Sequence, residues 1–276
     1  MVRRSLALLL ACASMVVGAA VVNGAAPAPV AVDRAVAAQR SAVREQLPRR
    51  ATIIGDSAMA GVRWNGALGG FRGFVADDRL ESCRRLVDNS CRGREGRRPL
   101  TALAEIMLLP RPAGTEVLII ATGYNDVDVK FPVHSRQVLD AAVAKGYQTI
   151  VWITYRENVT YQLPASTERE VSSYRGMNAE LRGLDASGAY PQLQLWDLND
   201  YTKFVSDSWF YSDGVHQVRR GSWGIADWIS RKMAHISAGP CPMPWGRSYG
   251  QEQPCPDPNV VRPTRGYPDI DALYDF

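Results

Sequence analysis

The residue types that could do chemistry together are a serine, an aspartate and a histidine. Ser57 follows a short apolar run and is preceded by Gly55 and Asp56, whereas Asp213 and His216 lie three residues apart much later in the chain. A hydroxyl is a weak nucleophile at neutral pH and needs an imidazole to accept its proton, and the imidazole needs an acid to fix its tautomer. These three residues therefore predict acyl transfer through a nucleophilic serine.

Acyl transfer also needs hydrogen-bond donors at the place where the oxyanion develops. Asn125, within residues 122–126, is a candidate donor, together with backbone N–H groups near Ser57 and in a glycine loop. The chain has three histidines, and only His216 is expected in a loop beside an acid. This chemistry needs no cofactor. We expect Asp126 to cap a turn, so no metal site is predicted.

The elements that must position these residues alternate along the chain. Short apolar runs predict buried strands, and segments with helical spacing predict helices. The expected strands are 51–54, 116–121, 149–153 and 193–196. The expected helices are 57–68, 101–109, 134–145, 172–184 and 221–235. Strands that alternate with helices predict an α/β fold with a parallel sheet covered on both faces. Functional residues gather at the carboxyl ends of such strands.

The composition is that of a globular protein. Of 276 residues, 46% are hydrophobic and 22% are charged, which excludes a disordered chain. The net charge is only +4, and basic residues are interleaved with acidic ones. A bulk electrostatic footprint for DNA or RNA is therefore absent, and we expect no nucleic-acid partner.

Residues 1–26 have the layout of an export signal. Two arginines precede an apolar run over residues 5–22, and small residues follow before Pro27. We expect cleavage and a secreted or cell-envelope protein. Two alternatives stay open, namely an uncleaved membrane anchor, because the run approaches the length of a membrane span, and a lipoprotein signal at Cys12. The mature protein is therefore expected to be soluble or tethered to a membrane at its N-terminal end.

Four further cysteines form an even set, as an oxidising compartment favours. They are Cys83, Cys91, Cys241 and Cys255. Four cysteines allow three pairings, of which the local one, Cys83 with Cys91 and Cys241 with Cys255, would staple two loop regions. Zinc is not expected, because no C-x-x-C spacing is present and no histidine lies close by. We divide the chain into the signal, a linker over 27–50, a domain over 51–238 and a proline-rich tail over 239–276.

The motifs, taken in order, resemble the four blocks of the SGNH (GDSL) hydrolase superfamily. They are Gly55-Asp56-Ser57, a glycine in a loop, Gly123-Tyr124-Asn125-Asp126 and Asp213-x-x-His216. The resemblance implies a flavodoxin-like α/β/α sandwich with a central parallel sheet. It also implies that Ser57 is the nucleophile, with Asp213 and His216 as acid and base. The implied oxyanion donors are the N–H of Ser57, the N–H of the second-block glycine and the side chain of Asn125.

The second-block glycine is assigned by spacing. Gly93 lies 36 residues after Ser57, a spacing similar to that of the family, and Gly70 and Gly73 are alternatives. Ala58 stands where the longer lipase-type motif has leucine, which does not affect the triad. The segment 83–98 resembles exported actinobacterial members, including domains that follow membrane acyltransferases.

Two groups of side chains near these motifs could contact substrate. Residues 209–211, Trp-Phe-Tyr, directly precede the acid block and are one candidate. The second group consists of arginines, which we expect to form a solvated loop face rather than to hold a carboxylate or phosphate of an envelope glycan. They are Arg84, Arg85, Arg92, Arg94, Arg97 and Arg98.

The sequence thus predicts an exported serine esterase that forms an acyl-enzyme on Ser57. A short acyl group such as acetyl on a cell-envelope carbohydrate is favoured, because no long apolar loop indicates a lipid tunnel. Two alternatives stay open. One is an O-acyltransferase on envelope glycans, since the sequence does not separate water from an alcohol as acceptor. The other is a catalytically idle envelope-binding module.

Overall fold

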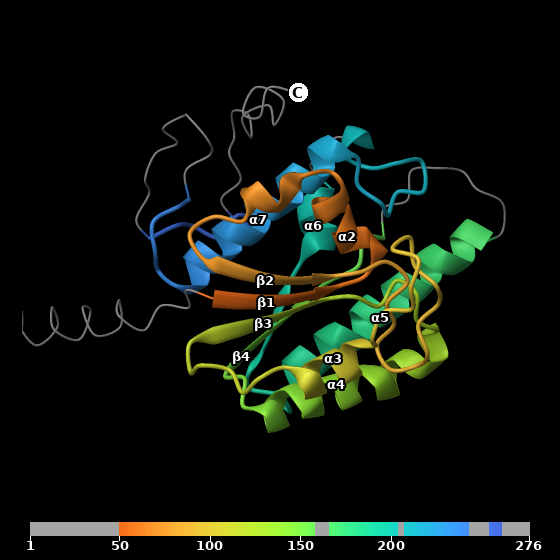
Figure 1. The fold of residues 1–276 in the computed structure, drawn as a ribbon, viewed down its shortest axis with the longest axis horizontal. Helices are drawn as coiled ribbons and strands as arrows, with labels where there is room; N and C mark the ends of the chain where they lie inside the picture. Colours follow the sequence, from red (N-terminus) through yellow and green to blue (C-terminus); the bar gives the residue numbers. More distant parts are fainter. Residues whose placement is uncertain (1–49, 158–165, 204–206, 243–253, 261–276) are drawn as a thin grey trace, which may run out of the picture. The chain divides into compact units, whose positions relative to one another are not determined.

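The computed structural model describes residues 50–157, 166–203, 207–242 and 254–260, whose centre is a five-stranded parallel sheet. The sheet has the order β2-β1-β3-β4-β5 (Figure 1). Its strands are β1 Arg50–Gly55, β2 Val75–Leu80, β3 Glu116–Ala121, β4 Thr149–Ile153 and β5 Leu193–Trp196. The predicted α/β fold with a covered parallel sheet is confirmed.

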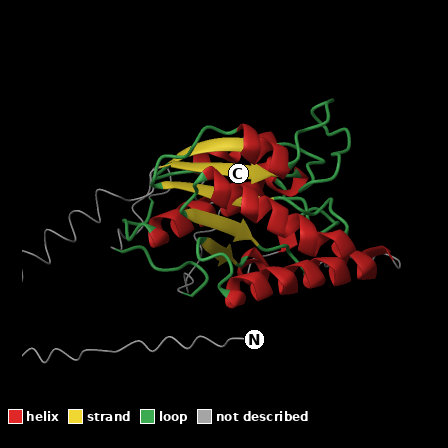
Figure 2. Ribbon diagram, turned by 90° about the horizontal axis from the view of Figure 1, so that it is seen from below, coloured by secondary structure: helices red, strands yellow, loops and turns green. Residues whose placement is uncertain are grey.

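Helices cover both faces of the sheet (Figures 1 and 2). The α-helices are α2 Ser57–Trp64, α3 Ala102–Leu108, α4 Phe131–Lys145, α5 Ser166–Ser187, α6 Leu198–Thr202 and α7 Arg219–Ile236. Three short 3-10 helices are η1 Ala67–Gly70, η2 Asp128–Lys130 and η3 Asp207–Trp209. Successive strand residues face opposite layers. On β1, Ile53 belongs to the core under α2, α6 and α7, and Ile54 to the core under α3, α4 and α5.

Strand β2 and helix α6 were not predicted. β2 reads Val-Ala-Asp-Asp-Arg-Leu, and five of its six residues are half-buried or exposed because it lies at the edge of the sheet. Asp78 of β2 pairs with Arg63 of α2 at 2.6 Å, so a charged residue serves here in place of an apolar one. Helix α2 also ends earlier than the predicted residue 68, because the chain turns at Gly66 with φ 69°.

Parallel pairing brings three strand ends to one edge. Gly55 is in register with Leu80 on one side and with Ala121 on the other. The pairing continues one residue further on both sides, since Glu81 N–H donates to Gly55 O at 3.1 Å and Asp56 N–H donates to Ala121 O at 3.3 Å. The residues that follow β1, β2 and β3 therefore lie side by side.

Both disulfide bonds follow the local pairing, Cys83 with Cys91 and Cys241 with Cys255. Part of the tail predicted to be irregular packs on α7. Cys255 N–H donates to Gly239 O at 2.8 Å, and Asp257 pairs with the buried Lys232 at 2.7 Å. The second disulfide therefore holds a segment that also has contacts of its own.

None of the helices formed by the described residues is long and apolar enough to cross a membrane. The export signal and the linker were predicted over residues 1–50. All of these residues except Arg50 lie outside the described part of the chain, so the signal stays a prediction.

Candidate active site

The three residues predicted to act together are joined by hydrogen bonds. His216 Nε2 lies 2.9 Å from Ser57 Oγ, and His216 Nδ1 lies 2.7 Å from Asp213 Oδ2. Ser57 is the first residue of α2, directly after β1, whereas the other two come from the loop between η3 and α7. Because the carboxylate can only accept, Nδ1 carries a proton toward Asp213 and Nε2 accepts from the serine hydroxyl.

The loop that carries the acid and the base is held by its own backbone. Asp213 Oδ1 accepts from the N–H groups of Val215 and His216, both at 2.9 Å. Gly214, with φ 70°, turns the chain, and its carbonyl accepts from the buried guanidinium of Arg156. Tyr211 N–H donates to His216 O at 2.8 Å, which closes the loop. The carboxylate is therefore fixed toward the imidazole.

These contacts set the charges of the dyad. Partial burial would raise the pKa of Asp213, but the hydrogen bonds from the His216 side chain and from two backbone N–H groups outweigh it and hold this pKa at about 2. The hydrogen bond to Asp213 raises the pKa of His216 above 6.5. The side chain of Asp213 is 44% exposed and that of His216 is 38% exposed, so the dyad is accessible from solvent.

Asp56 fixes the backbone on which Ser57 stands. One carboxylate oxygen accepts from Ala58 N–H at 3.0 Å and caps α2. The other accepts from the N–H groups of Gly123 and Tyr124, at 2.9 and 3.0 Å, and so joins the ends of β1 and β3. Burial raises the pKa of Asp56 despite these bonds. Sequence reasoning assigned Asp56 no role, although it stands between two motif residues.

The glycine in the third motif is required by close packing. Gly123 has φ 140°, and a Cβ atom there would collide with the Tyr155 hydroxyl. Tyr155 is buried and donates from this hydroxyl to Thr122 O at 3.0 Å. The turn that presents Asn125 is therefore pressed against a fixed tyrosine.

Two of the predicted oxyanion donors lie at this edge. Asn125 Nδ2 donates to Arg84 O at 3.2 Å, which uses one amide hydrogen and leaves the second for a ligand. The Ser57 N–H belongs to the first turn of α2 and makes no hydrogen bond to any described residue. The Ser57 N–H and the second Asn125 amide hydrogen are therefore both available to an oxyanion.

The structure does not bring Gly93 to the oxyanion position. Its N–H donates to Arg97 O at 2.8 Å, and its carbonyl accepts from Gly96 N–H at 3.0 Å, so Gly93 belongs to a local turn. A Cβ atom on Gly93 would collide with Ser82, which explains the glycine by packing. The two alternative glycines do not supply the donor either. Gly70 packs on α7, and Gly73 precedes β2 at the opposite end of the strands.

The arginine cluster divides into two kinds. Arg92, Arg94, Arg97 and Arg98 are exposed, as a solvated loop face predicts. For Arg84 that prediction is wrong, because this residue is 1% exposed. No sequence signal marks it, since Gly55, Leu100 and Glu105 reach it only through the fold.

The aromatic triplet before the acid block is mostly structural. Trp209 is buried against Tyr201, and Phe210 is buried beneath the Arg156 guanidinium at 4.0 Å. Only Tyr211, 55% exposed, is accessible to a substrate.

A small apolar hollow is lined by direct sequence neighbours of the triad residues. It has a volume of about 10 Å³, and its lining includes Ala58, Tyr124, Phe210 and Val215. Ala58 follows the serine, and Val215 precedes the histidine. No group of three His, Cys, Asp or Glu side chains among the described residues is arranged to hold a metal ion.

No protein-family model and no curated protein matches this chain. Solved structures do. Est24, a carbohydrate acetylesterase from Sinorhizobium meliloti, is 14% identical at a TM-score of 0.50, over 68% of this chain and 99% of that one. An M. smegmatis aryl esterase is 14% identical at a TM-score of 0.48, over 67% and 97%. A putative SGNH hydrolase from Slackia heliotrinireducens is 17% identical at 0.45, over 67% and 98%. The chain has the fold of Est24, and its ordered motifs resemble those of the SGNH hydrolases.

Proposed function

We propose that this protein is a serine esterase that hydrolyses carboxylic esters through an acyl-enzyme. The observation that carries the proposal is the continuous line of hydrogen bonds from Ser57 through His216 to Asp213. A hydroxyl, a base and an orienting acid in this arrangement are what activation of a serine requires.

The reaction follows from the proton positions. As Ser57 Oγ attacks the ester carbonyl carbon, His216 Nε2 accepts the hydroxyl proton, and the Asp213 carboxylate stabilises the imidazolium. The carbonyl oxygen becomes an oxyanion, which the Ser57 N–H and the second Asn125 amide hydrogen stabilise. His216 then returns the proton to the departing alkoxide. In the second half, water attacks the acyl carbonyl carbon while His216 Nε2 accepts a proton from the water. The bond between the acyl carbon and Ser57 Oγ then breaks, His216 returns the proton to Oγ, and the carboxylic acid leaves.

A short acyl group fits this site best. The hollow beside the triad is small and apolar, and Ala58 and Val215 in its lining adjoin the serine and the histidine, which supports a small apolar acyl substituent such as a methyl group. The fold is shared with a carbohydrate acetylesterase, which supports an acetylated sugar as substrate. The export pattern of residues 1–26 and two disulfide bonds support a substrate outside the cytoplasm, in the cell envelope.

The test is a comparison of acyl chain lengths. The full chain, exported into an oxidising compartment, is assayed with p-nitrophenyl acetate, butyrate and octanoate beside a Ser57→Ala variant. We expect kcat/KM to fall as the acyl chain lengthens, and all activity above the uncatalysed rate to require Ser57. Undiminished activity in a folded Ser57→Ala variant would refute the esterase, whereas a preference for octanoate would refute only the short acyl group.

A further inference from the structure

Arg84 is buried beside the site, and each nitrogen of its side chain has at least one polar partner. Its Nε donates to Gly55 O at 3.2 Å. The remaining partners are Leu100 O at 2.6 Å, Glu105 Oε2 at 3.0 Å, Arg79 O at 3.3 Å and Glu81 Oε2 at 3.6 Å. A guanidinium has five N–H donors in a fixed plane, and here it makes four hydrogen bonds and one longer ion-pair contact, with Glu81.

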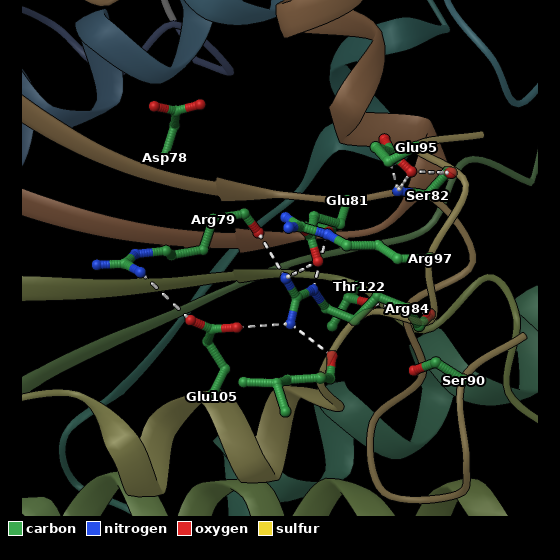
Figure 3. A network of polar contacts seen from close by, with 12 residues as sticks. Asp78, Arg79, Glu81, Ser82, Arg84, Ser90, Glu95, Arg97, Glu105 and Thr122 are labelled. Carbon is green, nitrogen blue, oxygen red and sulfur yellow. Dashed lines mark hydrogen bonds and ion pairs between the residues drawn. The ribbon is translucent and has the colours of Figure 1, made fainter. Parts of the chain in front are cut away.

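Two carboxylates balance the buried charge. Figure 3 shows the Arg84 guanidinium between Glu81 and Glu105, which are themselves only 12% and 11% exposed. Burial of a guanidinium is costly unless it is paired and hydrogen-bonded. The position of Arg84 is therefore specified from several sides, by β1, β2, α3 and the segment before α3.

The main chain of the same residue holds the oxyanion donor. Arg84 O accepts from Asn125 Nδ2 at 3.2 Å and lies 3.4 Å from Thr122 Oγ1. The side chain of Arg84 meanwhile holds Gly55 O, two residues before Ser57. One residue thus connects the strand that leads to the nucleophile with the side chain that faces the oxyanion.

We propose that Arg84 is a positioning residue of the oxyanion site. Its guanidinium fixes its own carbonyl, and this carbonyl fixes the rotamer of the Asn125 amide so that the second amide hydrogen points to the oxyanion. The inference rests on the proposed esterase activity and adds a residue to it. Lysine cannot replace Arg84, because an ammonium offers three donors from one point instead of five in a plane.

The test is a double-mutant cycle between Arg84→Lys and Asn125→Ala, assayed with p-nitrophenyl acetate. In the wild-type background, Arg84→Lys should lower kcat about tenfold and change KM less than about twofold, because the oxyanion forms only in the transition state. In the Asn125→Ala background the same substitution should cost less than about twofold. Equal losses in both backgrounds would overturn the inference.

Arg156→Lys is the matched control. Arg156 is also 1% exposed, and its guanidinium donates to Gly214 O of the histidine loop. Its contact beside Asn125, with the Tyr124 hydroxyl, is made by its backbone N–H, which Arg156→Lys retains. Its loss should be the same in both backgrounds. If Arg84→Lys fails to fold, Glu105→Gln replaces it in the cycle, because this change keeps a hydrogen-bond acceptor at Arg84 and removes one charge. Its smaller loss in kcat should likewise vanish in the Asn125→Ala background, and a loss that persists there would overturn the inference.

A spectroscopic readout separates this inference from the esterase proposal. The Asn125 side-chain amide is identified as the ¹H–¹⁵N pair missing from the spectrum of Asn125→Ala. Arg84→Lys should shift this pair and speed its exchange with water, whereas Arg156→Lys should leave it in place. An unmoved pair would overturn the positioning role even if no ester were hydrolysed, and loss of the esterase claim alone would leave this result standing.

Discussion

The two sides of the site are built in different ways. The acid–base side is one short loop, in which Asp213 binds the backbone of the residue three positions later and His216 closes the loop on Tyr211. The oxyanion side draws on the ends of β1, β2 and β3, joined by Asp56 and Arg84. The first side depends mainly on local contacts, with one distant support from the Arg156 guanidinium. The second exists only when the sheet has formed.

The largest effect is expected on the acid–base side. His216→Ala removes the base that contacts Ser57, so kcat should fall by roughly 10⁵- to 10⁶-fold, as when a triad member that acts as part of a unit is lost. Ester hydrolysis and circular dichroism measure the loss and the fold. A folded variant with more than a tenth of wild-type kcat would remove His216 from the reaction.

A smaller loss is expected from Asp213→Asn. The amide no longer fixes the imidazole tautomer, and kcat should fall about 10⁴-fold. Steady-state kinetics at pH 7 measure this loss. The variant should cost less than His216→Ala, and the opposite order would show that the carboxylate does more than orient the base.

On the oxyanion side, Asn125→Ala should lower kcat by roughly 10²- to 10³-fold with KM little changed, because one donor to the transition state is lost. Kinetics with p-nitrophenyl acetate test it. A rise in KM of the same size, with kcat unchanged, would mean that Asn125 binds the ground state instead. A loss as large as that of His216→Ala would break the contrast between the two sides.

Asp56→Asn should act on stability. Asp56 accepts from three backbone N–H groups, and an amide can turn only one oxygen toward them. The free energy of unfolding should fall by about 2 kcal/mol. Urea unfolding of this variant, beside an Asp128→Asn control on an exposed turn, measures the difference. Equal midpoints for Asp56→Asn and wild type would show that the β1–β3 junction does not depend on this carboxylate.

The smallest effect is on pH dependence. Only neutral His216 acts as the base, so kcat/KM should rise with pH through the pKa of His216. Asp213 raises this pKa above 6.5, so the rise of kcat/KM should be centred at a higher pH than the ordinary histidine pKa. In Asp213→Asn the limb should move to lower pH. A limb that moves upward would contradict the assignment of Asp213.

Asp213 and His216 stabilise the fold with opposite dependence on pH. Its pKa is lowered from 3.8 to about 2 in the folded chain, so its stabilising effect is present above pH 3.8 and is lost as the pH falls toward 2. His216, with a raised pKa, stabilises the fold fully below 6.5, and this contribution is lost as the pH rises through the folded pKa.

The same contrast explains what the sequence could predict. Strands β1, β3, β4 and β5 are apolar runs, so periodicity found them, and the acid and the base are neighbours in the sequence. Strand β2 was not predicted, because its central residues are charged and it pairs on one edge only. Arg84 escaped because Glu105 and Leu100 reach it only through the fold. Gly93 was misplaced because spacing alone does not reveal that its N–H is used within a local turn.

Covalent labelling of the nucleophile tests the central claim most directly. The protein is treated with a fluorophosphonate, and the adduct is located by mass spectrometry of its peptides. The account predicts one adduct, on Ser57, which forms far more slowly in His216→Ala and is absent from Ser57→Ala. An adduct on another residue, or none in a folded wild-type protein, would contradict it.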